Sequence, residues 1–239
     1  MRPQCTTRVR QTVGVRLSVH LSTFVALGLV FVVGGCAGPG SSATPGGHGI
    51  DFATIHLAGH GDGEATFTSP DQTTAIAVVS SAGFGSFSVQ SLAVDRSVID
   101  LLVSATSPYA GVVLFDWQAG NQAAAFRVTG GGDWTIDVEP VEHAPSWAAS
   151  SLTGSGDRVL RLAKPISRTT AIHVVHRAAG RLAITAFLGD EDEGEGSFAD
   201  LAQVPLLSVT GPYDGVMELP DGSILVTIRA DGDWTLSPV

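Results

Sequence analysis

Two short stretches of this chain carry most of its fold information: Gly132-Asp133-Trp134-Thr135-Ile136 and Gly232-Asp233-Trp234-Thr235-Leu236. In each stretch a tryptophan and an aliphatic residue two positions later alternate with polar residues. Period-two alternation is typical of a strand that has one buried and one solvated face. We therefore expect Trp134 and Trp234 to point into a core. The alternative is that these rings contact a ligand, for example by stacking on a sugar.

The two stretches belong to a longer internal repeat. Three further blocks recur in the same order, and their offsets differ by only a few residues. They are Leu57–Asp62 with Leu152–Asp157, Thr73–Val79 with Thr169–Val175, and Pro108–Val112 with Pro212–Val216. Matching blocks with drifting offsets are what duplication followed by loop insertions and deletions would produce. The sequence therefore predicts an internal duplication.

Each repeat has the pattern of a β-sheet module. Turn-forming Gly, Pro, Asp and Asn recur about every ten residues, and no segment after the leader holds a helical period. In the first repeat we expect eight short strands, near 52–58, 64–68, 74–80, 84–92, 99–103, 111–117, 123–129 and 134–138. The predicted fold is all-β, with two tandem β-sandwich or jelly-roll-like units, 51–142 and 152–239, joined by a linker at 143–151.

The strands that begin at Gly132-Asp133-Trp134 and Gly232-Asp233-Trp234 resemble the closing strand of bacterial pre-peptidase C-terminal type modules. This resemblance implies a jelly-roll-like fold for each unit. It implies no enzymatic activity, because such modules mostly bind or act as spacers. The Pro-Tyr-x-Gly motifs at Tyr109 and Tyr213 are interpreted as turn anchors whose hydroxyl groups bond to the backbone.

The N-terminus has the organisation of an export signal. Arginines at positions 2, 8, 10 and 16 precede an uncharged stretch from Leu21 to Val33, and Val33-Gly34-Gly35-Cys36 follows. This arrangement resembles the signal peptide and lipobox of bacterial lipoproteins. The resemblance implies cleavage after residue 35, acylation of Cys36, and anchoring in the lipid bilayer at the outer face of the cytoplasmic membrane. Residues 36–50 would then form the lipidated N-terminus and a flexible tether. Secretion without a lipid, or a retained membrane helix at 17–35, are the alternatives.

Composition and charge exclude several classes of protein. The chain is 44% hydrophobic, only 15% charged and contains 29 glycines, which excludes an acidic disordered tail and a long coiled coil. Without residues 1–35 it retains nine basic and 23 acidic residues, a net charge of −14. A surface this acidic argues against nucleic acid as a partner. Only Cys36 remains after cleavage, so no internal disulfide can form.

No sequence motif for nucleophilic, zinc-dependent or phosphate chemistry occurs, and no cofactor is expected. The acidic run that contains Asp190, Asp192 and Glu195 is a candidate calcium site, whereas a solvated loop is the simpler interpretation. Trp117 and Trp147 have no counterpart in the other unit, so we expect them to mark a ligand-binding surface.

Taken as a sequence, the chain is expected to be a non-enzymatic binding or scaffolding lipoprotein at the cell envelope. Its expected partner is a cell-wall glycan or an envelope protein. The alternative is an envelope-associated hydrolase, for example one that acts on glycans, whose carboxylates leave no local signature.

Overall fold

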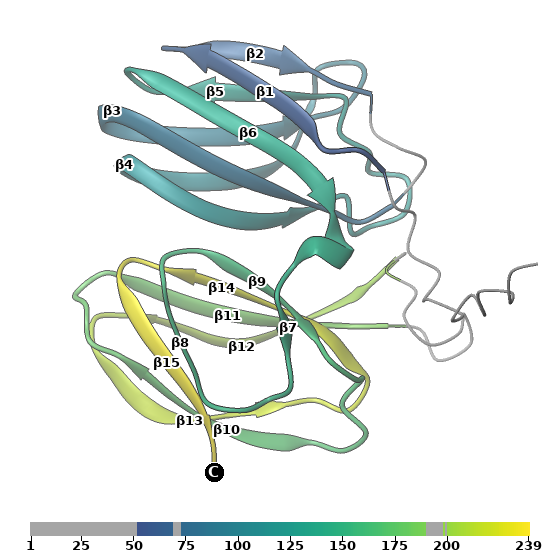
Figure 1. Ribbon diagram of the computed structural model, residues 1–239, viewed down its shortest axis with the longest axis vertical. Coiled ribbons are helices and arrows are strands. Elements are labelled where there is room, and N and C mark those ends of the chain that lie inside the picture. The colour runs from purple at the N-terminus through teal and green to yellow at the C-terminus, as the bar shows by residue number, and fades with distance from the viewer. Residues whose placement is uncertain (1–51, 69–72, 190–197, 199) are drawn as a thin grey trace, which may run out of the picture. The chain divides into compact units, whose positions relative to one another are not determined.

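The computed structural model describes residues 52–68, 73–189, 198 and 200–239. All of them lie in one compact unit of the chain, Thr44–Val239. Within these residues the regular elements are β-strands and one short 3-10 helix, η1 (Val141–His143), with no α-helix (Figure 1). This part of the chain also contains no helix long and apolar enough to cross a bilayer. The predicted all-β, sandwich-like fold is confirmed.

The first half of the described chain is a jelly roll. Its strands are β1 (Ile55–His60), β2 (Gly63–Thr66), β3 (Ala75–Leu92), β4 (Val98–Phe115), β5 (Ala125–Thr129) and β6 (Asp133–Pro140). β3 and β4 are long, and their antiparallel pairing is interrupted between Ser81 and Gly85. Before the interruption β3 pairs with β6, and after it β3 pairs with β5. Since β1 pairs with β6 and β2 with β5, the strands form two four-stranded faces, the arrangement of a jelly roll.

The second half repeats this order with shorter strands. They are β8 (Leu152–Ser155), β9 (Arg158–Leu162), β10 (Thr170–His176), β11 (Arg181–Leu188), β12 (Ala202–Thr210), β13 (Tyr213–Leu219), β14 (Ser223–Ala230) and β15 (Asp233–Pro238). One sheet has the order β13-β10-β15-β8, and the other has the order β12-β11-β14-β9. A short strand, β7 (Ser146–Trp147), adds to the second sheet in parallel with β9. The order matches that of the first jelly roll if β10 and β11 correspond to the two parts of β3, and β12 and β13 to the two parts of β4.

The two halves also hold their tryptophans in the same way. The Trp134 indole donates a hydrogen bond to the carbonyl of Gly61 at 2.9 Å, and the Trp234 indole donates one to Gly156 at 3.0 Å. Trp134 packs directly over Gly59, where a Cβ atom would collide with the ring, and Trp234 packs over Gly154 in the same manner. The two tryptophans are 5% and 2% exposed, so the expected core orientation is confirmed. Descent of both halves from one ancestral unit stays a prediction.

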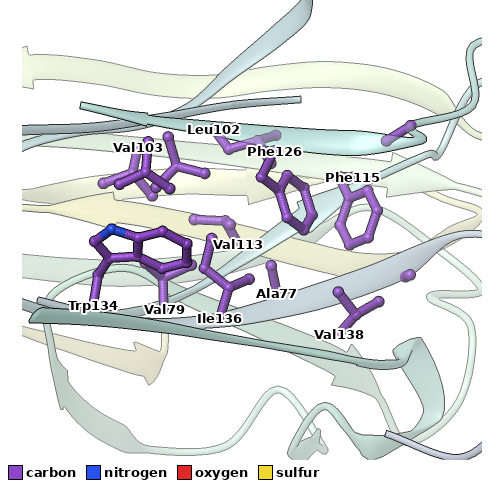
Figure 2. Close-up of a cluster of buried hydrophobic side chains, with 14 of the residues drawn as sticks. Ala77, Val79, Leu102, Val103, Val113, Phe115, Phe126, Trp134, Ile136 and Val138 are labelled. Atoms are coloured by element: carbon purple, nitrogen blue, oxygen red, sulfur yellow. The ribbon is translucent and has the colours of Figure 1, made fainter. Parts of the chain in front are cut away.

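Each jelly roll encloses its own hydrophobic core. In the first jelly roll the aromatic and aliphatic side chains of the two faces meet between the sheets (Figure 2). The labelled members of this core are Ala77, Val79, Leu102, Val103, Val113, Phe115, Phe126, Trp134, Ile136 and Val138. The second core includes Trp147, Ile172, Leu182, Ile184, Ile228 and Trp234. Alternation of buried and less buried residues along β6 and β11 supplies one row of core side chains from each strand.

One detail of the predicted strands differs from the structure. The segments 74–80 and 84–92, predicted as separate strands, are parts of the single strand β3, and 99–103 and 111–117 fall mainly within β4. Gly83 does not end the strand. It lies so close to the carbonyl of Gly131 that any side chain at this position would collide with it. This glycine therefore permits a close approach of two backbone segments within a continuing strand.

Candidate functional site

The two jelly rolls share a third hydrophobic cluster, which we call the junction cluster. Its buried members come from both jelly rolls and from the segment that joins them: Ile76, Leu114, Val141, Ala144, Val159, Phe187, Leu201, Ile224 and Leu225. Backbone hydrogen bonds accompany the packing, since Val112 donates to the carbonyl of Asp157 at 3.0 Å and Leu201 donates to that of Trp117 at 3.0 Å. Buried apolar contacts and backbone hydrogen bonds therefore hold the two jelly rolls together.

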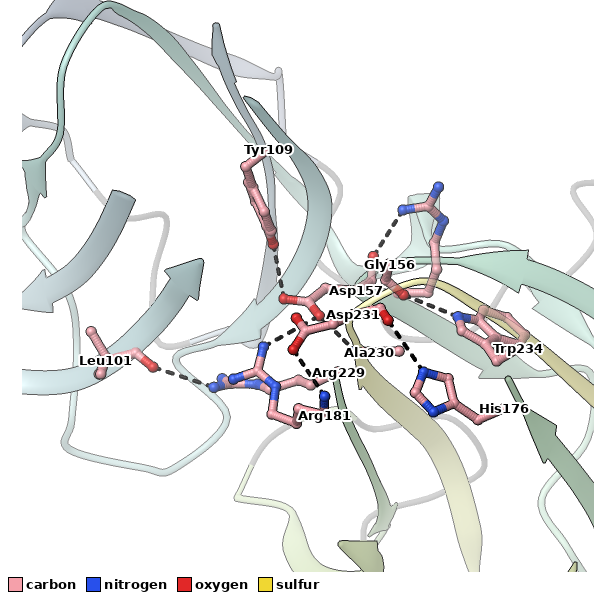
Figure 3. A network of polar contacts seen from close by, with 11 residues as sticks. Leu101, Tyr109, Gly156, Asp157, His176, Arg181, Arg229, Ala230, Asp231 and Trp234 are labelled. Atoms are coloured by element: carbon pink, nitrogen blue, oxygen red, sulfur yellow. Dashed lines mark hydrogen bonds and ion pairs between the residues drawn. The ribbon is translucent and has the colours of Figure 1, made fainter. Parts of the chain in front are cut away.

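Beside the junction cluster lies a buried polar network centred on Asp157, which is 2% exposed (Figure 3). One carboxylate oxygen, Oδ2, accepts a hydrogen bond from the Tyr109 hydroxyl at 2.9 Å. The other, Oδ1, accepts one from the backbone N–H of Ala230 at 2.9 Å and lies 3.8 Å from the Arg181 guanidinium. A buried carboxylate needs such partners to offset the loss of water. Asp157 thus connects strands of both jelly rolls.

Tyr109 and Tyr213 differ in their hydroxyl contacts although they occupy equivalent places in the sequence. Within the described part of the chain, the Tyr213 hydroxyl makes one long contact, at 3.5 Å to the carbonyl of Val216, in line with the expected backbone bonding. The Tyr109 hydroxyl instead donates to the Asp157 side chain, so for this residue the expectation is wrong. The reason is tertiary, because Tyr109 lies where the other jelly roll packs against it.

The Tyr109 contact predicts a pH dependence of stability. Burial, reinforced by the negative charge of Asp157, raises the pKa of the Tyr109 hydroxyl above its ordinary value. The folded protein therefore retains a proton that the unfolded chain releases above about pH 10, and this stabilisation is lost as the pH rises further. We expect the loss of melting temperature between pH 8 and pH 11 to be smaller in Tyr109→Phe than in the unmodified chain.

Tyr213→Phe is the matched control for this measurement, because among the described residues the Tyr213 hydroxyl contacts only the carbonyl of Val216. It should show the same alkaline loss of melting temperature as the unmodified chain. An equal alkaline loss in Tyr109→Phe and in the unmodified chain would contradict the assignment.

A cavity of about 450 Å³ lies next to the network and is lined by residues of both jelly rolls. Its wall in the first jelly roll comes from β3, β4 and the segment after β4, with Ser91, Ile99, Asp100, Leu102, Val112–Asp116, Trp117, Gln118 and Asn121. Its wall in the second jelly roll comes from β9, β11, β12 and β14, with Arg158, Ala183, Thr185, Phe187, Gln203 and Thr227–Arg229. The volume falls in the range of about 300–1,000 Å³ that is typical of small-molecule sites.

The charged groups of the cavity are tied to the backbone by known contacts. Arg229 donates to the carbonyl of Leu101 at 3.3 Å, and Arg158 donates to that of Asp157 at 2.8 Å. Asp100 accepts the backbone N–H of Leu101 at 2.7 Å, and Asp116 accepts that of Ala123 at 2.9 Å. Each guanidinium carries five N–H donors, so these contacts leave further donors at the cavity wall.

Trp117, which the sequence predicted to be a ligand-binding residue, lies in the wall of this cavity. Its ring contacts Phe187 of the second jelly roll edge-on, with ring centroids 5.3 Å apart and an interplanar angle of 70°. This packing holds the indole against the rim of the junction cluster, in which Trp117 is a partly buried member. Trp117 is therefore the sequence-predicted residue that the structure brings to the candidate site.

The structure corrects the prediction for Trp147. The expectation that it marks a ligand-binding surface is wrong, because its side chain is 3% exposed and belongs to the core of the second jelly roll. The cause is the parallel pairing of β7 with β9, which turns the ring inward, while its indole donates to the carbonyl of Ser150 at 2.8 Å. Buried aromatics of this kind contribute to folding.

Other residues singled out in the sequence lie outside the described part of the chain. Cys36 and the acidic residues Asp190, Asp192 and Glu195 all fall there. Among residues 52–68, 73–189, 198 and 200–239, no group of three or more His, Cys, Asp and Glu side chains is arranged to hold a metal ion. The candidate site thus consists of the cavity and its neighbouring network.

Sequence reasoning missed most of the cavity and network residues, above all Asp157, Arg158 and Arg229. One signal in the aligned repeats was available. Leu114 and Val159, both buried at the junction, stand opposite Glu218 and Glu64 in the other repeat. Such a difference indicates a surface of the β-sheet that is covered by protein in one repeat and exposed in the other.

Comparison with known proteins gives no family. No family model matches the chain, and no curated protein matches it. Among solved structures, the regulatory domain of Toxoplasma gondii PKA with cAMP matches at 8% identity and TM-score 0.22, over 74% of this chain and 78% of that one. The cAMP-bound PfPKA-R fragment 141-441 matches at 6% identity and TM-score 0.21, over 78% of this chain and 71% of that one.

A third match is the regulatory subunit of a cAMP-independent protein kinase A from Trypanosoma cruzi bound to guanosine. It has 7% identity and a TM-score of 0.21, over 74% of this chain and 72% of that one. Similarity at this level carries no argument about the present chain.

Proposed function

We propose that this chain is a bacterial extracytoplasmic lipoprotein that acts as a binding module at the cell envelope. The N-terminal sequence supports the location. Four arginines, an uncharged apolar stretch and Val33-Gly34-Gly35-Cys36 follow one another as in lipoprotein precursors. The acyl chains on Cys36 would hold the protein at the outer face of the cytoplasmic membrane, and residues 36–50 would separate it from the bilayer.

The cavity between the jelly rolls is the observation that supports a binding role. It combines fixed charged groups, amides, hydroxyls and an indole in one concave surface, so it offers hydrogen-bond partners and one aromatic face to a polar ligand. Its walls come from both jelly rolls, so the tandem arrangement itself creates the site. A cell-wall glycan or an envelope protein is the expected class of partner.

A hydrolase is the second candidate function, and one observation favours it. Asp100 and Asp116 line the same cavity, and a pair of carboxylates is what glycoside hydrolysis requires. Both carboxylates accept backbone hydrogen bonds, from Leu101 and Ala123, so each of them already has a contact within the fold. We therefore place binding first. Release of reducing sugar from envelope glycans by the unmodified chain, lost in Asp100→Asn, would reverse this order.

The anchoring part of the proposal is tested at Cys36. Cys36→Ser removes the thiol that would be acylated, so incorporation of labelled palmitate should stop and the uncut precursor should accumulate. Cys5→Ser is the matched control, because the other cysteine lies in the segment that would be removed. Metabolic labelling and membrane fractionation of both variants provide the measurement. Continued palmitate incorporation into Cys36→Ser would contradict lipid anchoring.

A further inference from the structure

The side chains that line the cavity include equal numbers of positive and negative charges. The second jelly roll contributes two guanidinium groups, Arg158 on β9 and Arg229 on β14. The first jelly roll contributes two carboxylates, Asp100 on β4 and Asp116 directly after it. A site for phosphate or another polyanion is expected to have an excess of positive charge, and a site for a cation an excess of carboxylates or an aromatic cage. Equal numbers of both signs favour a ligand without net charge.

One wall of the cavity presents a row of uncharged polar side chains. Thr185 on β11 pairs with Thr227 on β14, and Gln203 on β12 pairs with Phe187, two residues beyond Thr185. Because residues two apart and residues directly opposite share a face, both hydroxyls and the amide lie on the same side of the sheet. Among the described residues, the structure shows no side-chain hydrogen bond from these three groups. Their donors and acceptors are therefore available to a ligand.

The facing wall offers the complementary features. The Asp100 carboxylate is oriented through Oδ1 by the N–H of Leu101, while Gln118 accepts a hydrogen bond from Asn121 at 3.0 Å and keeps its own amide N–H groups. Trp117 adds an apolar aromatic surface that packing on Phe187 holds in place. Hydroxyl groups both donate and accept hydrogen bonds, so a polyhydroxylated molecule can satisfy mixed donors and acceptors on both walls at once.

We propose that this cavity binds a neutral, hydroxyl-rich small molecule with the size of one or two sugar rings. The inference rests on the proposed binding function and specifies its ligand. Asp100 and Gln203 are the ligand contacts assigned here, one from each jelly roll, and the ligand bridges the two walls. Both side chains are exposed, so replacing them need not disturb either core.

Isothermal titration of the full-length chain tests the proposal. The protein is kept in lauryldimethylamine oxide, because sugar-headed detergents would compete for the site. The neutral probes are maltose and N-acetylglucosamine, the zwitterionic probe is glycine betaine, and the anionic probes are citrate and inorganic phosphate. We expect a neutral saccharide to bind with an affinity that changes little between low and high salt. Asp100→Asn and Gln203→Ala should each weaken it by about tenfold, the effect of losing one strong hydrogen bond.

Asp221→Asn is the matched control. Asp221 is exposed and accepts the N–H of the next residue, Gly222, at 3.1 Å, as Asp100 does with Leu101, but it does not line the cavity. Its variant should bind the saccharide as tightly as the unmodified chain. Equal weakening by Asp221→Asn would overturn the assignment of the cavity.

The outcomes separate this inference from the proposed function. Binding of citrate, phosphate or betaine that Asp100→Asn or Gln203→Ala alters would overturn the neutral ligand and leave a binding module. Binding of no probe at millimolar concentration would also overturn the inference. The proposed binding function would fall only if, in addition, the unmodified chain retained neither cell-wall glycan nor an envelope protein.

Discussion

Replacing Trp134 or Trp234 by alanine is expected to lower the free energy of unfolding by about 3–5 kcal/mol. Each indole is almost wholly buried in its own core, and each packs over a glycine that leaves room for no other side chain. The truncation would open a cavity and leave the carbonyl of Gly61 or Gly156 without its indole donor. Denaturant unfolding followed by circular dichroism measures the loss.

Trp117→Ala is the matched control for these two variants. Trp117 is only partly buried and lies at the cavity wall, so its truncation should cost clearly less stability than either core variant. Trp134→Phe should give an intermediate loss, because it keeps an aromatic ring and removes the indole donor. Native-like unfolding of both alanine variants would contradict the core assignment and point to rings that face solvent or a ligand.

Replacing Asp157 by alanine is expected to cost about 3–5 kcal/mol as well, for a different reason. The change leaves the Tyr109 hydroxyl and the Ala230 N–H without their acceptor in a buried place, and it removes the carboxylate that faces Arg181. Buried donors without partners lose their bonds to water and gain nothing in return. Thermal and denaturant unfolding of the variant test the prediction.

The chain contains its own control for this second prediction. Asp62 stands at the matching place of the first jelly roll and accepts the N–H of Gly130 at 2.8 Å, as Asp157 accepts that of Ala230. Asp62 is exposed and makes no contact to a tyrosine hydroxyl among the described residues. Asp62→Ala should therefore cost only about 1 kcal/mol. If both variants lost a similar amount of unfolding free energy, the contacts of Asp157 across the junction would contribute no extra stability.

Much of the fold could be predicted from local patterns in the sequence. Alternation at Trp134 and Trp234 predicted buried strands, and the structure places both rings in cores. The repeated blocks mark equivalent places, since Gly61 and Gly156 accept the same indole bond. These features could be read because β-sheet periodicity and close glycine packing involve residue types at fixed spacing.

The candidate site was far less predictable. Trp117 was singled out and lies in the cavity wall, whereas Trp147 was singled out on the same ground and is buried. Both lack a counterpart in the other repeat, so this criterion does not separate a cavity residue from a core residue. The parallel pairing of β7 with β9 buries the Trp147 side chain. A two-residue strand is too short for its sequence to predict such a pairing.

The sequence by itself predicted that this chain is built from alternating β-strands and that Trp134 and Trp234 point into a core, and it contains no motif for nucleophilic or zinc chemistry. The tertiary structure alone decided how the jelly rolls meet. Tyr109 and Asp157 are 48 positions apart, and Arg229 reaches a carbonyl 128 positions away, at Leu101. The physical reason is that strand formation depends on near neighbours, whereas a cavity depends on which distant faces pack together.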